Sequence, residues 1–302
     1  MSTRAPTGHP FFIVDVFAER RYCGNQLGVF PDAGGLSDEQ MQRFAKEMNY
    51  SETTFILSRE PRDDGYDVRI FTPDKEIPFA GHPTLGTAFI IQQTIIGRTV
   101  EEVILNLRVG PIPVAFSYDQ NNPETLIMTQ KKPTFGPTVD ARGMAGALGL
   151  REEDLDENFP AQEVSTGLPF IIVPLKTLEG LRRIRVNVER SLDLVENLDA
   201  KAVLAFCPQA HQEQNDLSVR VFAHYYGVAE DPATGSANGC LAGYLVKHRY
   251  FGDNWIDIRV EQGYEIGRPS LLLLKAQEDG DDIEVRVGGG VVLVARGEFI
   301  AD

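Results

Sequence analysis

Two short stretches combine small residues, prolines and polar side chains in a pattern suited to anion binding. The first is GHPT at residues 81–84, and the second is DPATGS at residues 231–236. Each is followed by an apolar segment with helical spacing, so each is expected to open a helix. The first turn of a helix leaves backbone N–H groups unpaired beside the positive end of the helix dipole. Such a turn can bind a carboxylate or a phosphate.

The two stretches also resemble each other. Arg-Ile-Phe precedes the first at 69–71, and Arg-Val-Phe precedes the second at 220–222. Aligning the two prolines places His82 opposite Asp231. Self-similarity about half a chain apart predicts an internal duplication. The alternative is a chance likeness between two helix starts that are rich in glycine and proline.

Four polar side chains in or near these stretches have a chemical and a structural interpretation. Glu52 opens the β-rich segment 50–57 and could move a proton if burial raised its pKa, or it could be a surface glutamate at a strand edge. His82 would be neutral at a helix start, as a hydrogen-bonding group or as a core histidine. Asp231 and Ser236 could cap the helix, contact a ligand, or do both.

Composition excludes several classes of protein. The chain has 302 residues, 42% hydrophobic and 24% charged, which is typical of a globular protein with two medium domains. A net charge of −15 argues against a nucleic-acid partner. The three cysteines form no CxxC pair, the five histidines form no metal-binding pattern, and no phosphate-binding GxxxxGK loop is present. We therefore expect no metal and no cofactor.

The sequence also carries no targeting signal that we recognise. Its first ten residues lack an apolar core, so no secretory signal is expected. No apolar run approaches the ~18–20 residues that a membrane-spanning helix needs. The expected location is the cytoplasm, without a membrane partner.

The elements that would position these residues are mixed strands with one long helix in each half. Apolar strands are expected at 11–17 and 50–57, and Ser37 with Gln40 has the spacing of a capping box. The polar, proline-containing segment 119–124 is the best boundary between domains. This order of elements indicates an α+β or α/β fold.

Further motifs connect the chain to a known family. They are VDVF at 14–17 with Gly24-Asn25, SETTF at 51–55, FTP at 71–73, and Gly289-Gly290 before the last strand. Together with GHPT and DPATGS, and in this order, they resemble the PhzF-like family of phenazine biosynthesis isomerases, relatives of diaminopimelate epimerase. The resemblance covers nearly the whole chain. It implies an α+β fold of two similar domains, each a curved, barrel-like mixed sheet around a central helix, with the active site between the domains.

The resemblance also assigns ranges and roles. The N-terminal repeat would span 9–120 with a returning strand at about 291–302, and the C-terminal repeat would span 124–290. The catalytic acid/base falls on Glu52. The substrate would be bound by Gly81, His82, Pro83, Asp231, Gly235 and Ser236.

The implied activity is a cofactor-independent isomerase that moves a proton on a small carboxylate-bearing substrate. In the family's best-known member this substrate is trans-2,3-dihydro-3-hydroxyanthranilate, and a homodimer is a possible assembly. The alternatives are a non-catalytic small-molecule binding protein and an amino-acid epimerase or racemase. The epimerase relatives use two cysteines, but the corresponding loops at 80–82 and 231–233 carry no thiol. Asp231 or His82 would have to substitute for them.

Overall fold

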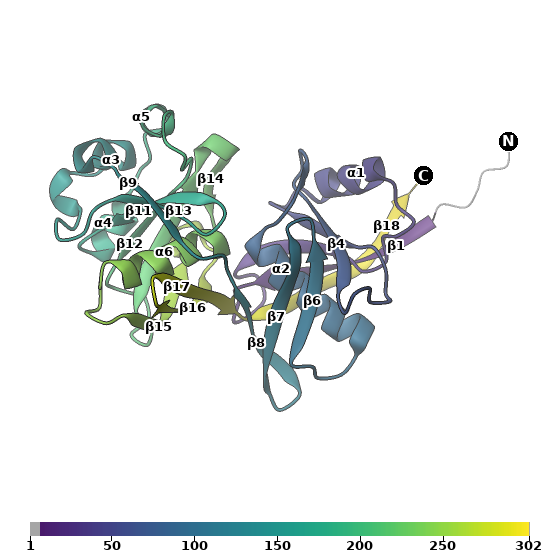
Figure 1. The fold of residues 1–302 in the computed structure, drawn as a ribbon. Coiled ribbons are helices and arrows are strands. Elements are labelled where there is room, and N and C mark those ends of the chain that lie inside the picture. The colour runs from purple at the N-terminus through teal and green to yellow at the C-terminus, as the bar shows by residue number, and fades with distance from the viewer. Residues whose placement is uncertain (1–6, 302) are drawn as a thin grey trace. The chain divides into compact units, whose positions relative to one another are not determined.

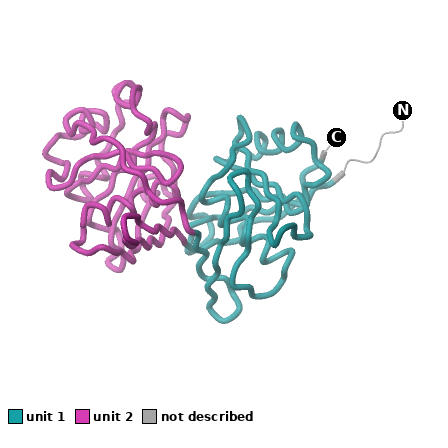
Figure 2. The backbone as a smooth tube through the Cα atoms, in the orientation of Figure 1, with its two compact units in different colours: residues 1–128, 289–302 teal, residues 129–288 magenta. Residues whose placement is uncertain are grey.

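A computed structural model describes residues 7–301 of the protein, which form two compact units (Figure 2). Unit 1 comprises residues 1–128 and 289–302, and unit 2 comprises residues 129–288. Residues 1–6, on which the expectation about a secretory signal partly depends, lie outside the described residues. So does residue 302, the last of the expected returning strand.

Unit 1 contains nine strands and two α-helices among its described residues (Figure 1). The strands are β1 (Thr7–Val16), β2 (Asn25–Phe30), β3 (Thr53–Ile56), β4 (Tyr66–Phe71), β5 (Glu76–Ile77), β6 (Glu102–Leu107), β7 (Gly110–Asp119), β8 (Asn122–Thr129) and β18 (Val291–Ala301). The helices are α1 (Asp38–Met48) and α2 (Gly81–Ile91), and a π-helical turn, Gln92–Ile96, extends α2.

Unit 2 contains the remaining strands and four α-helices. The strands are β9 (Thr134–Thr138), β10 (Gln162–Ser165), β11 (Pro169–Pro174), β12 (Val203–Cys207), β13 (Leu217–Ala223), β14 (Val228–Asp231), β15 (Trp255–Gln262), β16 (Ser270–Asp279) and β17 (Asp282–Gly289). The helices are α3 (Ala141–Leu148), α4 (Leu178–Arg183), α5 (Val188–Val195) and α6 (Gly235–Lys247).

The two units have the same strand topology. In unit 1 the strands pair in the order β18, β1, β2, β3, β4, β6, β7, β8, and only β2–β3 and β4–β6 are parallel. In unit 2 the order is β9, β10, β11, β12, β13, β15, β16, β17, and only β11–β12 and β13–β15 are parallel. The short strands β5 and β14 lie in equivalent places, beside β4 and β13. This equivalence supports the internal duplication.

Helices α2 and α6 are the central helices of the two units. Every residue of α2 is buried, and so is every residue of α6 from Gly235 to Val246 except Ser236. Helix α2 contacts β1, β2 and β18 from one end of its sheet and β6 and β7 from the other, so the sheet curves round the helix. Helix α6 contacts β10, β11, β12, β15 and β16 in the same way. The predicted fold class is confirmed.

Equivalent ion pairs connect the strands that lead into these helices. Arg69 of β4 donates two hydrogen bonds, of 2.9 and 2.7 Å, to the carboxylate of Glu76. Arg220 of β13 donates two, of 2.8 and 2.7 Å, to Glu230. Paired bonds of this kind fix a guanidinium and a carboxylate in one plane. The repeated Arg-x-Phe pattern therefore marks the same structural device in both units.

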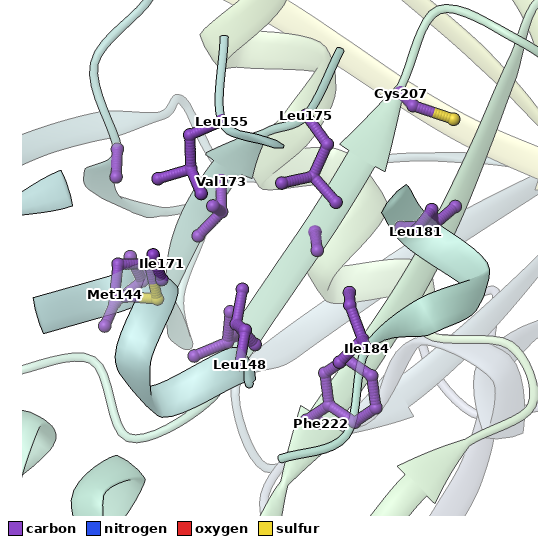
Figure 3. Close-up of a cluster of buried hydrophobic side chains, with 14 of the residues drawn as sticks. Met144, Leu148, Leu155, Ile171, Val173, Leu175, Leu181, Ile184, Cys207 and Phe222 are labelled. Atoms are coloured by element: carbon purple, nitrogen blue, oxygen red, sulfur yellow. The ribbon is translucent and has the colours of Figure 1, made fainter. Parts of the chain in front are cut away.

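Each unit packs a separate hydrophobic core. In unit 1, Phe30 stacks on Phe55 at a ring distance of 5.0 Å, and Phe44 lies 5.3 Å from Phe30. In unit 2, Met144 and Leu148 of α3 pack with Ile171 of β11 and further apolar residues (Figure 3). Burial of these side chains drives each unit to fold around its own sheet.

Segment 119–124 is the turn of the β7–β8 hairpin, and the compact units divide after residue 128. Polar turn residues serve a hairpin as well as a linker, so composition did not distinguish the two. The ranges 9–120 and 124–290 stay a prediction about the extent of the repeats. No helix in the described part of the chain is long and apolar enough to cross a membrane.

Candidate functional site

The starts of α2 and α6 differ from those of the other α-helices in the described chain. Helices α1, α3, α4 and α5 each begin with a side chain that accepts a hydrogen bond from the first turn; these caps are Ser37, Asp140, Thr177 and Asn187. Helices α2 and α6 have Ala80 and Thr234 at the N-cap position, and neither residue makes a side-chain cap. In their first turns no N-cap side chain competes with a ligand for the unpaired N–H groups.

In unit 1 the start of α2 lies beside Glu52. Glu52 directly precedes β3, and β3 contacts α2. Its Oε2 atom lies 3.4 Å from Nε2 of His82, the second residue of α2. The two side chains are 18% and 7% exposed, so both are largely shielded from water. Titratable groups that face each other at a shielded site mark a candidate functional site.

His82 is a neutral imidazole in this setting. Burial lowers the pKa of His82 to about 3, although a hydrogen bond with the backbone of Gln26 acts in the opposite direction. Within the described chain, Nε2 has no hydrogen-bond partner, which leaves Nδ1 for the bond with Gln26. Because that bond favours the charged ring, Nδ1 is its donor. The neutral ring therefore presents the lone pair of Nε2 towards Glu52.

Helix α2 supports its own first turn. Thr84 Oγ1 donates to the carbonyl of Ala80 at 2.8 Å, and Thr87 Oγ1 donates to the carbonyl of Pro83 at 2.6 Å. Gly86 lets the helix approach the sheet, since a Cβ there would lie 2.6 Å from Leu27 Cδ2. Gly81 and Pro83, the first and third residues of α2, are themselves buried.

In unit 2 the loop 231–234 leads from β14 into α6. Thr234 Oγ1 donates to Asp231 Oδ2 at 2.5 Å, which orients the carboxylate. Gly235 and Ser236 are the first two residues of the helix, so their N–H groups belong to the uncapped turn. The arrangement pairs a fixed carboxylate with an anion-binding turn.

Sequence reasoning missed Thr234 and Gln262 at this loop. Gln262 lies at the end of β15, and its side chain reaches the loop from 28 residues away in the sequence. A lone glutamine after a β-rich segment belongs to no motif, so no signal in the sequence indicated it.

The structure gathers the predicted residues in two groups. Glu52, Gly81, His82 and Pro83 lie together in unit 1. Asp231, Gly235 and Ser236 lie together in unit 2. Their roles stay predictions.

The thiols are buried, and that of Cys240 lies within α6. Cys23, Cys207 and Cys240 are free and buried. Burial raises the pKa of Cys207 to about 11 and that of Cys240 to about 12, so both are thiols at neutral pH. No group of three His, Cys, Asp or Glu side chains within residues 7–301 is arranged to hold a metal ion.

Comparisons with known proteins agree with this architecture. The family model described as phenazine biosynthesis-like protein matches residues 14–297. A Pseudomonas aeruginosa protein named trans-2,3-dihydro-3-hydroxyanthranilate isomerase is 34% identical over 292 residues, which cover 96% of this chain and 98% of that protein. The crystal structure of a Bacillus anthracis phenazine biosynthesis protein of the PhzF family has a TM-score of 0.90 at 27% identity, covering 98% of this chain and 100% of that one.

A more distant structure shares the fold alone. The crystal structure of a hydroxyproline epimerase from Agrobacterium vitis has a TM-score of 0.63 at 9% identity, covering 99% of this chain and 93% of that one. The resemblance drawn from the motifs is confirmed, and with it the isomerase class. The chain belongs to the phenazine biosynthesis-like family, PhzC-PhzF.

Proposed function

We propose that Glu52 is the general acid/base of an isomerase that moves a proton between two carbons of a small carboxylate. No metal or organic cofactor is required for such a step. The substrate named for the Pseudomonas aeruginosa relative, trans-2,3-dihydro-3-hydroxyanthranilate, is the first candidate, because that relative is similar over nearly its whole length.

The contact between Glu52 and His82 carries this proposal. His82 Nε2 lies 3.4 Å from Glu52 Oε2, and burial keeps the imidazole neutral, so no positive charge beside Glu52 holds its carboxyl permanently in the ionised form. A carboxyl with this neighbour can hold the proton and can give it up. Shielding from water strengthens the electrostatic interactions that this carboxyl makes with a bound substrate.

The uncapped helix starts would bind the carboxylate. Their N–H groups and the helix dipole favour an anion without requiring a charged side chain. This matters for a chain with a net charge of −15, whose overall field repels an anionic substrate. Asp231 and Ser236 would fix the orientation of the polar groups on the substrate.

Replacing Glu52 with glutamine tests the assignment. The amide keeps the shape of the side chain but cannot carry the proton, so turnover of trans-2,3-dihydro-3-hydroxyanthranilate should fall by on the order of 10²–10⁴-fold. Glu60→Gln is the matched control, because Glu60 is an exposed glutamate that follows the same strand.

Three outcomes are informative. Loss of turnover in Glu52→Gln with unchanged substrate binding supports the proposal. Near-normal turnover would move the proton transfer to Asp231 or His82. Binding without turnover by the unaltered protein would favour the non-catalytic binding protein.

A further inference from the structure

The loop 231–234 is held by a buried side chain that no motif includes. Gln262 is 1% exposed and ends β15, and its amide faces the loop between β14 and α6. We infer that Gln262 is a positioning residue that sets the geometry of the carboxylate of Asp231 and of the uncapped first turn of α6. The inference rests on the proposed function, because it assigns Gln262 to substrate binding at that turn.

All four hydrogen-bonding positions of the Gln262 amide are used. Nε2 donates to the carbonyl of Asp231 at 2.8 Å and to Thr234 Oγ1 at 3.0 Å. Oε1 accepts from the N–H of Thr234 at 3.1 Å and from Nδ2 of Asn238 at 2.9 Å. A carbonyl can only accept and a backbone N–H can only donate, so the nitrogen and oxygen of Gln262 cannot be exchanged. The amide therefore has one orientation.

The hydrogen bonds of Gln262 are connected through the hydroxyl of Thr234 to the carboxylate of Asp231. Thr234 Oγ1 accepts from Gln262 and donates its own proton to Asp231 Oδ2 at 2.5 Å. Gln262 thus fixes the direction of the threonine hydroxyl, and the hydroxyl fixes the carboxylate. Hydrogen bonds in such a chain strengthen one another in a shielded site.

Other side chains hold the neighbouring carbonyls. Ser270 Oγ donates to the carbonyl of Pro232 at 2.9 Å, and Asn238 Nδ2 donates to that of Thr234 at 3.0 Å. Gln130 Nε2 donates to the carbonyl of Gly235 at 2.9 Å. With its carbonyls held in this way, the loop keeps its N–H groups aimed in fixed directions, which is what a preorganised anion site requires.

This assignment predicts a particular kinetic defect. Methionine matches glutamine in length but makes none of the four bonds, so Gln262→Met should loosen the loop and leave Glu52 unchanged. Binding at the anion-binding turn acts on the bound substrate and on the transition state alike. The KM should therefore rise about tenfold or more while kcat stays within about threefold of its original value. Gln277→Met is the control, since Gln277 is exposed on the neighbouring strand β16.

A second variant separates positioning from folding. Gln262→Glu loses both donors while its carboxyl is ionised and regains one when the carboxyl is protonated. Its KM, relative to that of the unaltered protein at the same pH, should therefore improve as the pH is lowered. The relative KM of Gln262→Met should not change with pH. A residue that only supported the fold would not produce this difference.

The test combines these kinetics, on trans-2,3-dihydro-3-hydroxyanthranilate, with amide hydrogen exchange of the substrate-free protein measured by mass spectrometry. We expect faster exchange confined to residues around 231–238 in Gln262→Met, together with the raised KM. An unchanged KM, or unchanged exchange in this segment, would overturn the inference. Faster exchange throughout unit 2 would also overturn it by making Gln262 a general stabiliser. Failure of the proposed function is separate, because it shows as normal turnover in Glu52→Gln.

Discussion

Units 1 and 2 share a topology but have different helix starts. Each unit surrounds a buried, uncapped central helix with strands in the same order. In unit 1 the helix start carries His82, in contact with Glu52. In unit 2 it carries Gly235 and Ser236, behind a loop held by Gln262. One scaffold thus offers titratable groups in one copy and a fixed set of polar groups in the other.

The difference shows what a duplicated fold preserves and what it leaves free. The ion pairs Arg69–Glu76 and Arg220–Glu230 have nearly the same geometry, because they hold equivalent strands. The second residues of the two central helices, His82 in α2 and Ser236 in α6, differ in chemistry. The scaffold therefore fixes where a functional residue lies, and the side chain decides what it does there.

The variant with the largest expected effect removes the proton transfer that we assign to Glu52 in unit 1 and leaves unit 2 unchanged. Glu52→Gln should reduce kcat by on the order of 10²–10⁴-fold, because the amide cannot transfer a proton. Substrate affinity, measured by calorimetric titration, should stay close to that of Glu60→Gln. A large loss of affinity together with kcat would make Glu52 a substrate anchor and would contradict the division of roles between the units.

The variant with the next largest expected effect disturbs the start of α6 in unit 2 and leaves unit 1 intact. A Cβ at Gly239 of α6 would lie 1.8 Å from Gln130 Oε1, so Gly239→Ala should push Gln130 away from the carbonyl of Gly235. We expect a loss of about 1–3 kcal/mol in the free energy of unfolding, measured in urea. Gly180→Ala is the control, because its Cβ would meet Thr177 Oγ1 at an ordinary 3.4 Å. Equal stability of the two variants would show that the Gln130 contact is unimportant.

A smaller effect tests the neutral state of His82. Its pKa is about 3 in the folded protein against 6.5 without burial, so between these values the unfolded chain binds a proton that the folded protein does not. The effect of His82 on the free energy of unfolding is therefore most favourable above about pH 6.5. The free energy of unfolding then decreases as the pH falls towards about 3.

Urea unfolding near pH 7 and near pH 5 measures the contribution. The drop in unfolding free energy between them should be about 2 kcal/mol larger for the unaltered protein than for His82→Gln. His248→Gln should change the drop less, because His248 is only partly buried. An equal drop in the unaltered protein and His82→Gln would show that burial does not lower the pKa of His82.

The smallest effect concerns the thiols. The raised pKa of Cys240 keeps it protonated and unreactive, and the proposed reaction does not use it. Cys240→Ala should keep kcat within about threefold of its original value, since its role is packing. A loss comparable to that of Glu52→Gln would revive an epimerase mechanism that depends on a thiol.

Much of this architecture could be predicted from the sequence. The likeness of the two helix starts indicated the duplication, and the capping box at Ser37 and Gln40 is present with both of its hydrogen bonds. These features depend on residues close together in the chain, where spacing determines contact. The motifs then supplied the family and the overall fold.

The contacts within the site could not be predicted in the same way. Glu52 and His82 are 30 residues apart, and their separation depends on how β3 packs against α2. Gln262 reaches Thr234 only because β15 pairs in parallel with β13, which brings its end near the loop. Such contacts are set by strand register and helix packing, which residue spacing alone does not specify.

Proton transfer by Glu52 is tested most directly in heavy water. The protein and Glu52→Gln are each incubated with trans-2,3-dihydro-3-hydroxyanthranilate in deuterium oxide, and the product is analysed by NMR and mass spectrometry. We predict that the unaltered protein forms an isomerised product with deuterium at the newly protonated carbon, and that Glu52→Gln binds the substrate but neither isomerises it nor exchanges its hydrogens. Isomerised, deuterated product from Glu52→Gln at an undiminished rate would contradict the account.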